Sequence, residues 1–338
     1  LLLANVGYNG QIAKYISSFA VEFQNKYWSN VNVWSCENTE VEMVVKKLNS
    51  VGRFRNSFEL IYGNGTKMLV SDELMLDSVI QLLHGSKDGM PEPFEFVKIL
   101  TYLDKSDSPI VKENIMMVEL LFYNYIRHDV NLRHFQLFYG ILHNPSTMLE
   151  LIKLAWLPDN EQAKEIRKNE FAKNKNLSSI AKIALEILHG LEAQPCENNN
   201  GVVNGQDLKK YAKELLEAAK SEYLERPAMY VIGKLLGNIN LGEDYPPPYL
   251  GEILEELDKD EIDDEYRRQL FNRHGFTCRA YNEGGTIERK REKKFLSYAE
   301  KTRFTYDRIT IVFEKLASEY HHMGDREDVN AKLEDLDN

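Results

Sequence analysis

Two adjacent glycines, Gly284 and Gly285, stand just before a dense run of basic side chains, and such a combination could bind a phosphate. The basic residues are Arg289, Lys290, Arg291, Lys293 and Lys294. A nucleotide-binding P-loop follows a strand and has a lysine at a fixed distance after its glycines, so that backbone amides and the lysine converge on one phosphate. No strand pattern precedes Gly284, and the lysine spacing differs from that motif. We therefore expect a helix here and no nucleotide site.

The expected helix begins near Thr286, with Thr286 as its N-cap and Glu288 in its first turn, where a carboxylate interacts favourably with the helix dipole. Five basic residues against Glu288 and Glu292 leave a local charge of 5 − 2 = +3. Such a run is typical of a solvated helix face. It is also the candidate contact for an anion or a protein partner, and a nucleic-acid contact through Arg289–Lys294 is an alternative function.

A second group of residues, His84, His128 and Asp129, could bind a metal ion. All-α phosphohydrolases of the HD type use a distant histidine and an adjacent His-Asp pair, because imidazole and carboxylate suit such cations. A metal-dependent phosphohydrolase is therefore another alternative function. The spacing of the other histidines does not complete the ligand set, and Asp129-Val130-Asn131 is typical of a capped loop between helices. We predict no catalytic, metal or cofactor site.

The histidine pair His321-His322 precedes Gly324 and stands among acidic residues. Adjacent side chains point in different directions on a helix, so the two histidines do not share one ion easily. Histidine is favoured near a helix C-terminus and glycine just beyond it. We therefore expect a helix to end at Gly324.

The composition limits the classes of partner. The formal net charge of −11 argues against a chain that binds nucleic acid or an anionic membrane over its whole surface. Three scattered cysteines without a CxxC pair support neither a zinc site nor a disulfide framework, and they fit a reducing cytoplasm. No run of about 18 apolar residues exists, so we expect no membrane span. The expected location is cytoplasmic.

The elements that must position these residues are helices. Apolar residues recur with the helical period in four segments, and each stripe must be buried against a neighbouring element. The stripes are Val41, Val44, Val45 and Leu48; Ile180, Ile183, Ala184, Ile187, Leu188 and Leu191; Leu208, Tyr211, Ala212, Leu215, Leu216 and Ala219; and Ile309, Val312, Phe313, Leu316, Ala317 and Tyr320. Convincing strand patterns are absent, so the predicted fold class is all-α.

Helix signals indicate short antiparallel helices. Helices are expected to start at Ser71-Asp72, Ser108-Pro109 and Asn144-Pro145, and to end at glycines such as Gly52, Gly85 and Gly140. The predicted architecture is an irregular antiparallel helical-hairpin array, α-solenoid-like, over residues 1–159. A polar linker follows over 160–176, and a C-terminal helical bundle occupies 177–338. Aromatic residues such as Trp28, Trp34 and Trp156 are expected in the core.

Several segments together resemble a known type of helical region. They are GFTCRAYNEGGTIERK, Phe295–Tyr298, Ile309–Tyr320, Arg326-Glu327-Asp328, LLFYNYIRHD, Asn144–Trp156 and Tyr27–Gly52. They are similar to the degenerate TPR/HEAT-like C-terminal region of large, mostly uncharacterised bacterial multidomain proteins, some of them of defence or NTPase type. The resemblance implies a non-catalytic scaffold or binding region of a bacterial intracellular protein. Its partner would be another protein or an upstream domain of the same polypeptide.

Overall fold

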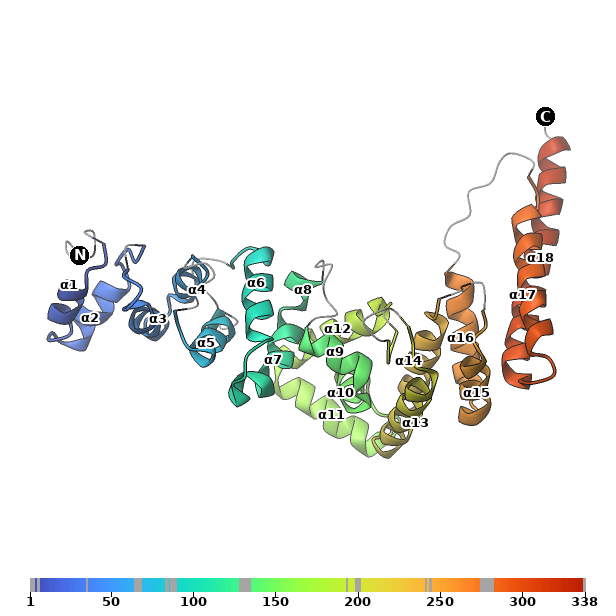
Figure 1. Cartoon of the computed structure of the whole chain (residues 1–338), viewed down its shortest axis with the longest axis horizontal. Coiled ribbons are helices and arrows are strands. Elements are labelled where there is room, and N and C mark those ends of the chain that lie inside the picture. Colours follow the sequence, from blue (N-terminus) through green and yellow to red (C-terminus); the bar gives the residue numbers. More distant parts are fainter. Residues whose placement is uncertain are drawn as a thin grey trace. The chain divides into compact units, whose positions relative to one another are not determined.

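The computed structural model describes residues 4, 7–34, 36–63, 69–82, 85, 90–127, 135–192, 194–197, 202–240, 242, 245–273 and 283–336. These residues form 18 helices and no strand, which confirms the all-α prediction (Figure 1). In chain order the helices are α1 (Gly10–Ile16), α2 (Val21–Trp28), α3 (Val41–Ser50), α4 (Phe54–Gly63), α5 (Asp72–Leu82), α6 (Pro93–Leu103), α7 (Pro109–Leu121), α8 (Tyr123–Ile126), α9 (Gln136–His143), α10 (Pro145–Ala155), α11 (Glu161–Lys173), α12 (Lys175–Gly190), α13 (Gly205–Ser221), α14 (Glu225–Gly237), α15 (Pro248–Leu257), α16 (Asp260–Asn272), α17 (Thr286–Thr302) and α18 (Asp307–Leu336). Within these ranges every helix is too short or too polar to cross a lipid bilayer.

The chain divides into two compact units, Leu1–Tyr139 and Gly140–Asn338. The boundary predicted near residue 160 lies within the second unit. Residues 160–176, predicted as a polar linker, contain α11, which packs against α12. The composition of α11 explains the difference. Its Glu, Gln, Ala, Lys and Arg residues favour a helix through local propensity, although the helix buries none of its side chains. A search for an apolar stripe therefore misses it.

In the first unit, each of several helices packs against the next helix and the one after it. Helix α3 contacts α4 and α5, α5 contacts α6 and α7, and α6 contacts α7 and α8. This is the contact pattern of stacked helix pairs. Phe96 lies at the centre of the unit's aromatic core, with its ring centroid 5.0 Å from Phe58, 4.5 Å from Phe122 and 4.9 Å from Tyr125.

The second unit has contacts between helices that are further apart in sequence, as expected of a bundle. Helix α10 packs against α12, α13 and α14, and α18 packs against α15, α16 and α17. Phe313 on α18 is fully buried. Four aromatic rings surround it at centroid distances of 5.5 to 6.5 Å, namely Tyr245, Tyr266, Phe295 and Tyr298.

Most of the predicted helix signals are confirmed. Helices α5, α7 and α10 begin at Asp72, Pro109 and Pro145. The predicted stripes of α3, α13 and α18 are buried throughout, and that of α12 is buried from Ala184 onward. Trp34 departs from the expectation, because 66% of its surface is exposed.

The predicted glycine stops are confirmed in part. Gly52 and Gly85 have φ values of 76° and 98°, the left-handed conformation that a glycine cap adopts without strain. Gly140, in contrast, lies inside α9, and Gly324 lies inside α18, which continues to Leu336. The role of Gly324 is close packing. A Cβ atom on Gly285, at the start of α17, would lie only 2.3 Å from the Gly324 carbonyl oxygen.

Candidate functional site

His84, His128 and Asp129, the metal ligands of the alternative function, lie outside the described residues. Among the residues that the structure does describe, no group of three or more His, Cys, Asp or Glu side chains is arranged to hold a metal ion.

The side chains of the predicted basic run point in two directions on α17: the lysines into solvent and the arginines toward α18. The helix begins at Thr286 as expected, but its N-cap is Gly285, and the Thr286 hydroxyl donates to the Glu283 carbonyl oxygen at 3.0 Å. The side chains of Lys290, Lys293 and Lys294 are exposed, as predicted for a solvated face.

Arg289 does not belong to that solvated face. Its guanidinium donates to the carboxylates of Asp325 and, at 3.1 Å, Asp328 on α18. It also lies 2.9 Å from Nδ1 of His321. The guanidinium lowers the pKa of Asp325, while the Gly285 N–H and then Arg289 lower the pKa of Asp328. Arg289 therefore joins the start of α17 to α18.

Arg291 is also directed toward α18. Its guanidinium carbon lies 5.6 Å from the ring centroid of Tyr320, which is a cation–π distance. The two arginines of the predicted contact thus support the α17–α18 hairpin, and the three lysines remain available to a partner.

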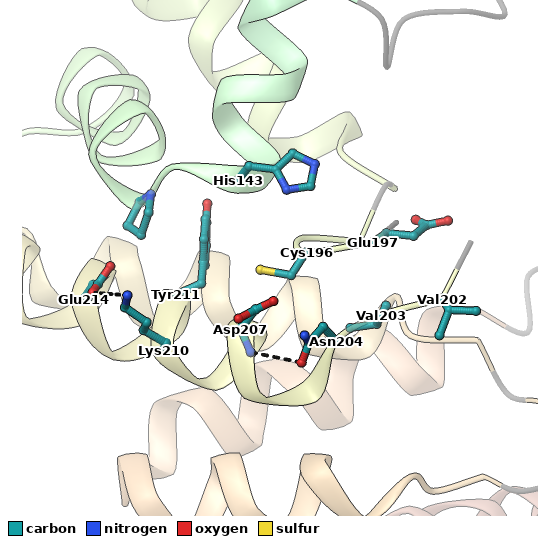
Figure 2. A pocket seen from close by; sticks show the side chains of 11 residues that line it. His143, Cys196, Glu197, Val202, Val203, Asn204, Asp207, Lys210, Tyr211 and Glu214 are labelled. Carbon is teal, nitrogen blue, oxygen red and sulfur yellow. Dashed lines mark hydrogen bonds and ion pairs between the residues drawn. The ribbon is translucent and has the colours of Figure 1, made fainter. Parts of the chain in front are cut away.

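A hollow of about 670 Å³ lies in the second unit between the end of α9, the first turns of α13 and the segment that precedes α13 (Figure 2). Tyr211 forms part of its wall and donates its hydroxyl hydrogen to the Ile141 carbonyl oxygen at 2.5 Å. The Cys196 N–H donates to the Leu142 carbonyl oxygen at 3.0 Å. These two bonds hold the wall in place, and the acidic residues Glu197, Asp207 and Glu214 line the hollow.

The Cys196 thiol in this hollow is not an activated nucleophile. Burial, followed by the charge of Asp207, raises the pKa of the Cys196 thiol to about 11. The thiol is therefore protonated at neutral pH, whereas the thiolate is the reactive form. Lys210 is 3.8 Å from Glu214, four residues further along α13, an ion pair of the ordinary helix-surface type.

The first unit carries a feature that sequence reasoning missed. Four apolar side chains on α1, α2 and the turn between them are exposed: Tyr15 (62%), Phe19 (40%), Val21 (67%) and Phe23 (62%). We call these four residues the apolar patch. The ring centroids of Tyr15 and Phe19 are 5.0 Å apart in an edge-to-face arrangement, and those of Phe19 and Phe23 are 6.4 Å apart.

Hydrogen bonds fix the turn that carries the apolar patch. The Gln24 side chain on α2 donates to the carbonyl oxygens of Ser17 (3.1 Å) and Phe19 (2.8 Å). The hydroxyl groups of Ser17 and Ser18 donate to the carbonyl oxygens of Lys14 and Tyr15. Below the patch, α1 and α2 bury Ala13, Ile16, Tyr27 and Trp28. The patch is thus a supported surface and not a frayed end.

The spacing of these rings does not distinguish exposed from buried side chains in the sequence. Tyr15, Phe19 and Phe23 are four residues apart, which is also the spacing of a buried helical stripe. The chain turns between α1 and α2 at residues 17–20, so the stripe is broken and its rings stay on the outside.

Comparisons with known proteins identify no relative: no family model matches the sequence, and searches of curated proteins and of solved structures find no similar chain.

Proposed function

We propose that this chain is a non-catalytic helical scaffold that binds a protein through the apolar patch on α1 and α2. The partner is another protein or a domain upstream in the same polypeptide, in the cytoplasm of a bacterium. The observation that carries the proposal is the exposure of three rings, with Phe19 in contact with both Tyr15 and Phe23, around a turn that side-chain hydrogen bonds fix.

A partner that covers the apolar patch gains free energy because the patch is removed from water. Removing apolar surface from water contributes roughly 25 cal/mol per Å². Exposed aromatic side chains that cluster together are typical of the energetic centre of a protein interface. Because the turn is already fixed, the patch loses little conformational entropy when a partner covers it.

The packing of the first unit supports the same function. Stacked helix pairs contact mainly their neighbours, so they present an extended surface on which several elements can contact one partner. In this respect the unit is comparable to TPR-like and HEAT-like helix pairs, which the sequence resemblance also suggests.

The proposal is tested with a tagged full chain and two matched double variants. Tyr15→Ser with Phe23→Ser removes two exposed side chains of the apolar patch. Ile166→Ser with Tyr223→Ser removes two side chains of similar exposure (63% and 53%) outside the patch. Proteins retained from a bacterial lysate are identified and quantified by mass spectrometry, after circular dichroism has shown equal helix content.

We expect the wild type and the Ile166/Tyr223 variant to enrich the same identified protein. The patch variant should retain it about tenfold less, since two of the three aromatic side chains of the patch are lost. Equal retention by both variants would contradict a function of the apolar patch.

A further inference from the structure

The outer face of α17 carries four lysines and one exposed glutamate, Glu300, so its net charge is 4 − 1 = +3. Lys290, Lys293, Lys294 and Lys301 are exposed, and the helical period places them opposite the buried stripe of Phe295 and Ala299. The other two carboxylates of α17 face away from these lysines or are paired elsewhere. Glu288 is fully buried, and Glu292 lies 3.5 Å from Arg289 and 3.0 Å from His321. Among the residues that the structure describes, no ion pair joins a carboxylate, Glu300 included, to any of these four lysines.

Two of the lysines are held in position by the protein. The Nζ atoms of Lys294 and Lys301 lie 5.7 and 5.8 Å from the ring centroid of Tyr298. Lys301 also donates to the Tyr245 carbonyl oxygen at 3.3 Å. Their charges are therefore partly ordered before any partner arrives, which lowers the entropic cost of binding.

Phe304 projects from the turn that follows this lysine face, with 95% of its surface exposed. The turn is well defined, because the N–H groups of Thr305 and Tyr306 both donate to the Thr302 carbonyl oxygen at 2.9 Å. Arg303 and Glu314 form an ion pair across the turn at 3.0 Å. Phe304 is thus an apolar side chain held out in solvent at one end of a cationic face.

We propose that this face binds a short acidic segment of a partner protein, with an apolar residue of that segment packed against Phe304. From Lys290 to Lys301 the face extends about 16 Å at about 1.5 Å per residue, the length of about five extended residues. Four lysines opposite several carboxylates give electrostatic complementarity. This surface is separate from the apolar patch of the first unit, and its binding does not depend on that patch.

Acidic side chains around the lysine face of α17 favour a short acidic segment as its partner over a long polyanion. Asp258 and Asp260, whose side chains are 78% and 93% exposed, are bound to Arg308 at the start of α18, close to the turn that carries Phe304. The chain as a whole has a net charge of −11. A nucleic acid or an anionic bilayer that extended beyond the lysine face would meet these negative charges.

The test measures fluorescence anisotropy of a labelled Glu/Asp peptide that ends in Phe, with the full chain at low salt. The variant is Lys290→Gln with Lys293→Gln and Lys294→Gln. The matched control is Lys168→Gln with Lys173→Gln and Lys220→Gln, three exposed lysines on α11 and α13. Both variants change the net charge equally, so the comparison separates the α17 face from bulk charge. Unchanged thermal unfolding of both shows that they fold.

We expect the α17 variant to bind the peptide about tenfold more weakly than wild type, and the control to stay within about twofold. Phe304→Ala should weaken binding of the Phe-containing peptide and leave binding of the same peptide with Gly at that end unchanged. Equal affinities of the two triple variants would overturn the proposal. Preferential binding of duplex DNA or of phosphatidylserine vesicles through the same lysines would overturn the assignment to an acidic peptide.

Discussion

Phe313 and Phe304 stand close together in the chain at opposite extremes of burial. Four rings surround Phe313, whereas Phe304 is 95% exposed. We predict that Phe313→Ala lowers the free energy of unfolding of the second unit by about 3–5 kcal/mol, because a cavity replaces the ring. Phe304→Ala should change it by less than about 0.5 kcal/mol. Urea unfolding measures both values, and equal effects of the two substitutions would show that Phe313 is not the centre of this core.

Glu119 on α7 gives a pH-dependent prediction. Its fully buried carboxyl group accepts from the backbone N–H groups of Leu137 (2.6 Å) and Gln136 (3.3 Å). Burial, and further the charge of Asp104, raises its pKa from 4.5 to about 8. The folded state therefore holds this proton more tightly than the unfolded state. The resulting stabilisation is complete below about pH 4.5 and is lost as the pH rises through about 8.

Glu119→Gln keeps a neutral side chain of the same shape at every pH. The free energy of unfolding of this variant, relative to wild type, should therefore increase steadily between about pH 5 and about pH 8. Glu113→Gln, at an exposed position of the same helix, is the control and should show no such trend. Parallel pH profiles for wild type and Glu119→Gln would mean that Glu119 is ionised throughout this range.

At the scale of elements, the α17–α18 hairpin depends on contact between two glycines. A Cβ atom at Gly285 would lie 2.3 Å from the carbonyl oxygen and 2.6 Å from the Cα atom of Gly324. Gly285→Ala should therefore lower the melting temperature, at a cost of about 1–3 kcal/mol. Gly242→Ala is the matched control, because a Cβ atom there has no neighbour within 4 Å. If both substitutions left the melting temperature unchanged, the two helices would not be in backbone contact at Gly285.

The helices could be predicted from the sequence where burial of one face imposes a helical period on the apolar residues. The stripes of α3, α13 and α18 were predicted because each must face a neighbouring element. Helix α11 was missed because it buries no side chain, so its sequence has no apolar period to detect. The helix forms through its local helical propensity. Gly324 was predicted to be a helix end because close packing between helices and a helix end can both require glycine.

At the scale of the whole molecule, the candidate binding surfaces were harder to predict than the fold. Periodicity shows which side chains share one helix face, but tertiary packing decides whether that face is covered. Tyr15, Phe19 and Phe23 have the spacing of a buried stripe, yet all three are exposed. The basic run of α17 was identified correctly as a helix face, but its arginines proved to contact α18.

The most direct test of the account is site-specific photo-cross-linking from the apolar patch. Benzoylphenylalanine is placed at Phe23 and, as the control, at Tyr223, two positions with 62% and 53% exposure. The proposed function predicts that ultraviolet light in living bacterial cells produces one dominant cross-link from position 23, to another protein or to an upstream domain, and none to that partner from position 223. The same adducts from both positions, or no adduct from position 23, would contradict a scaffold that binds its partner through α1 and α2.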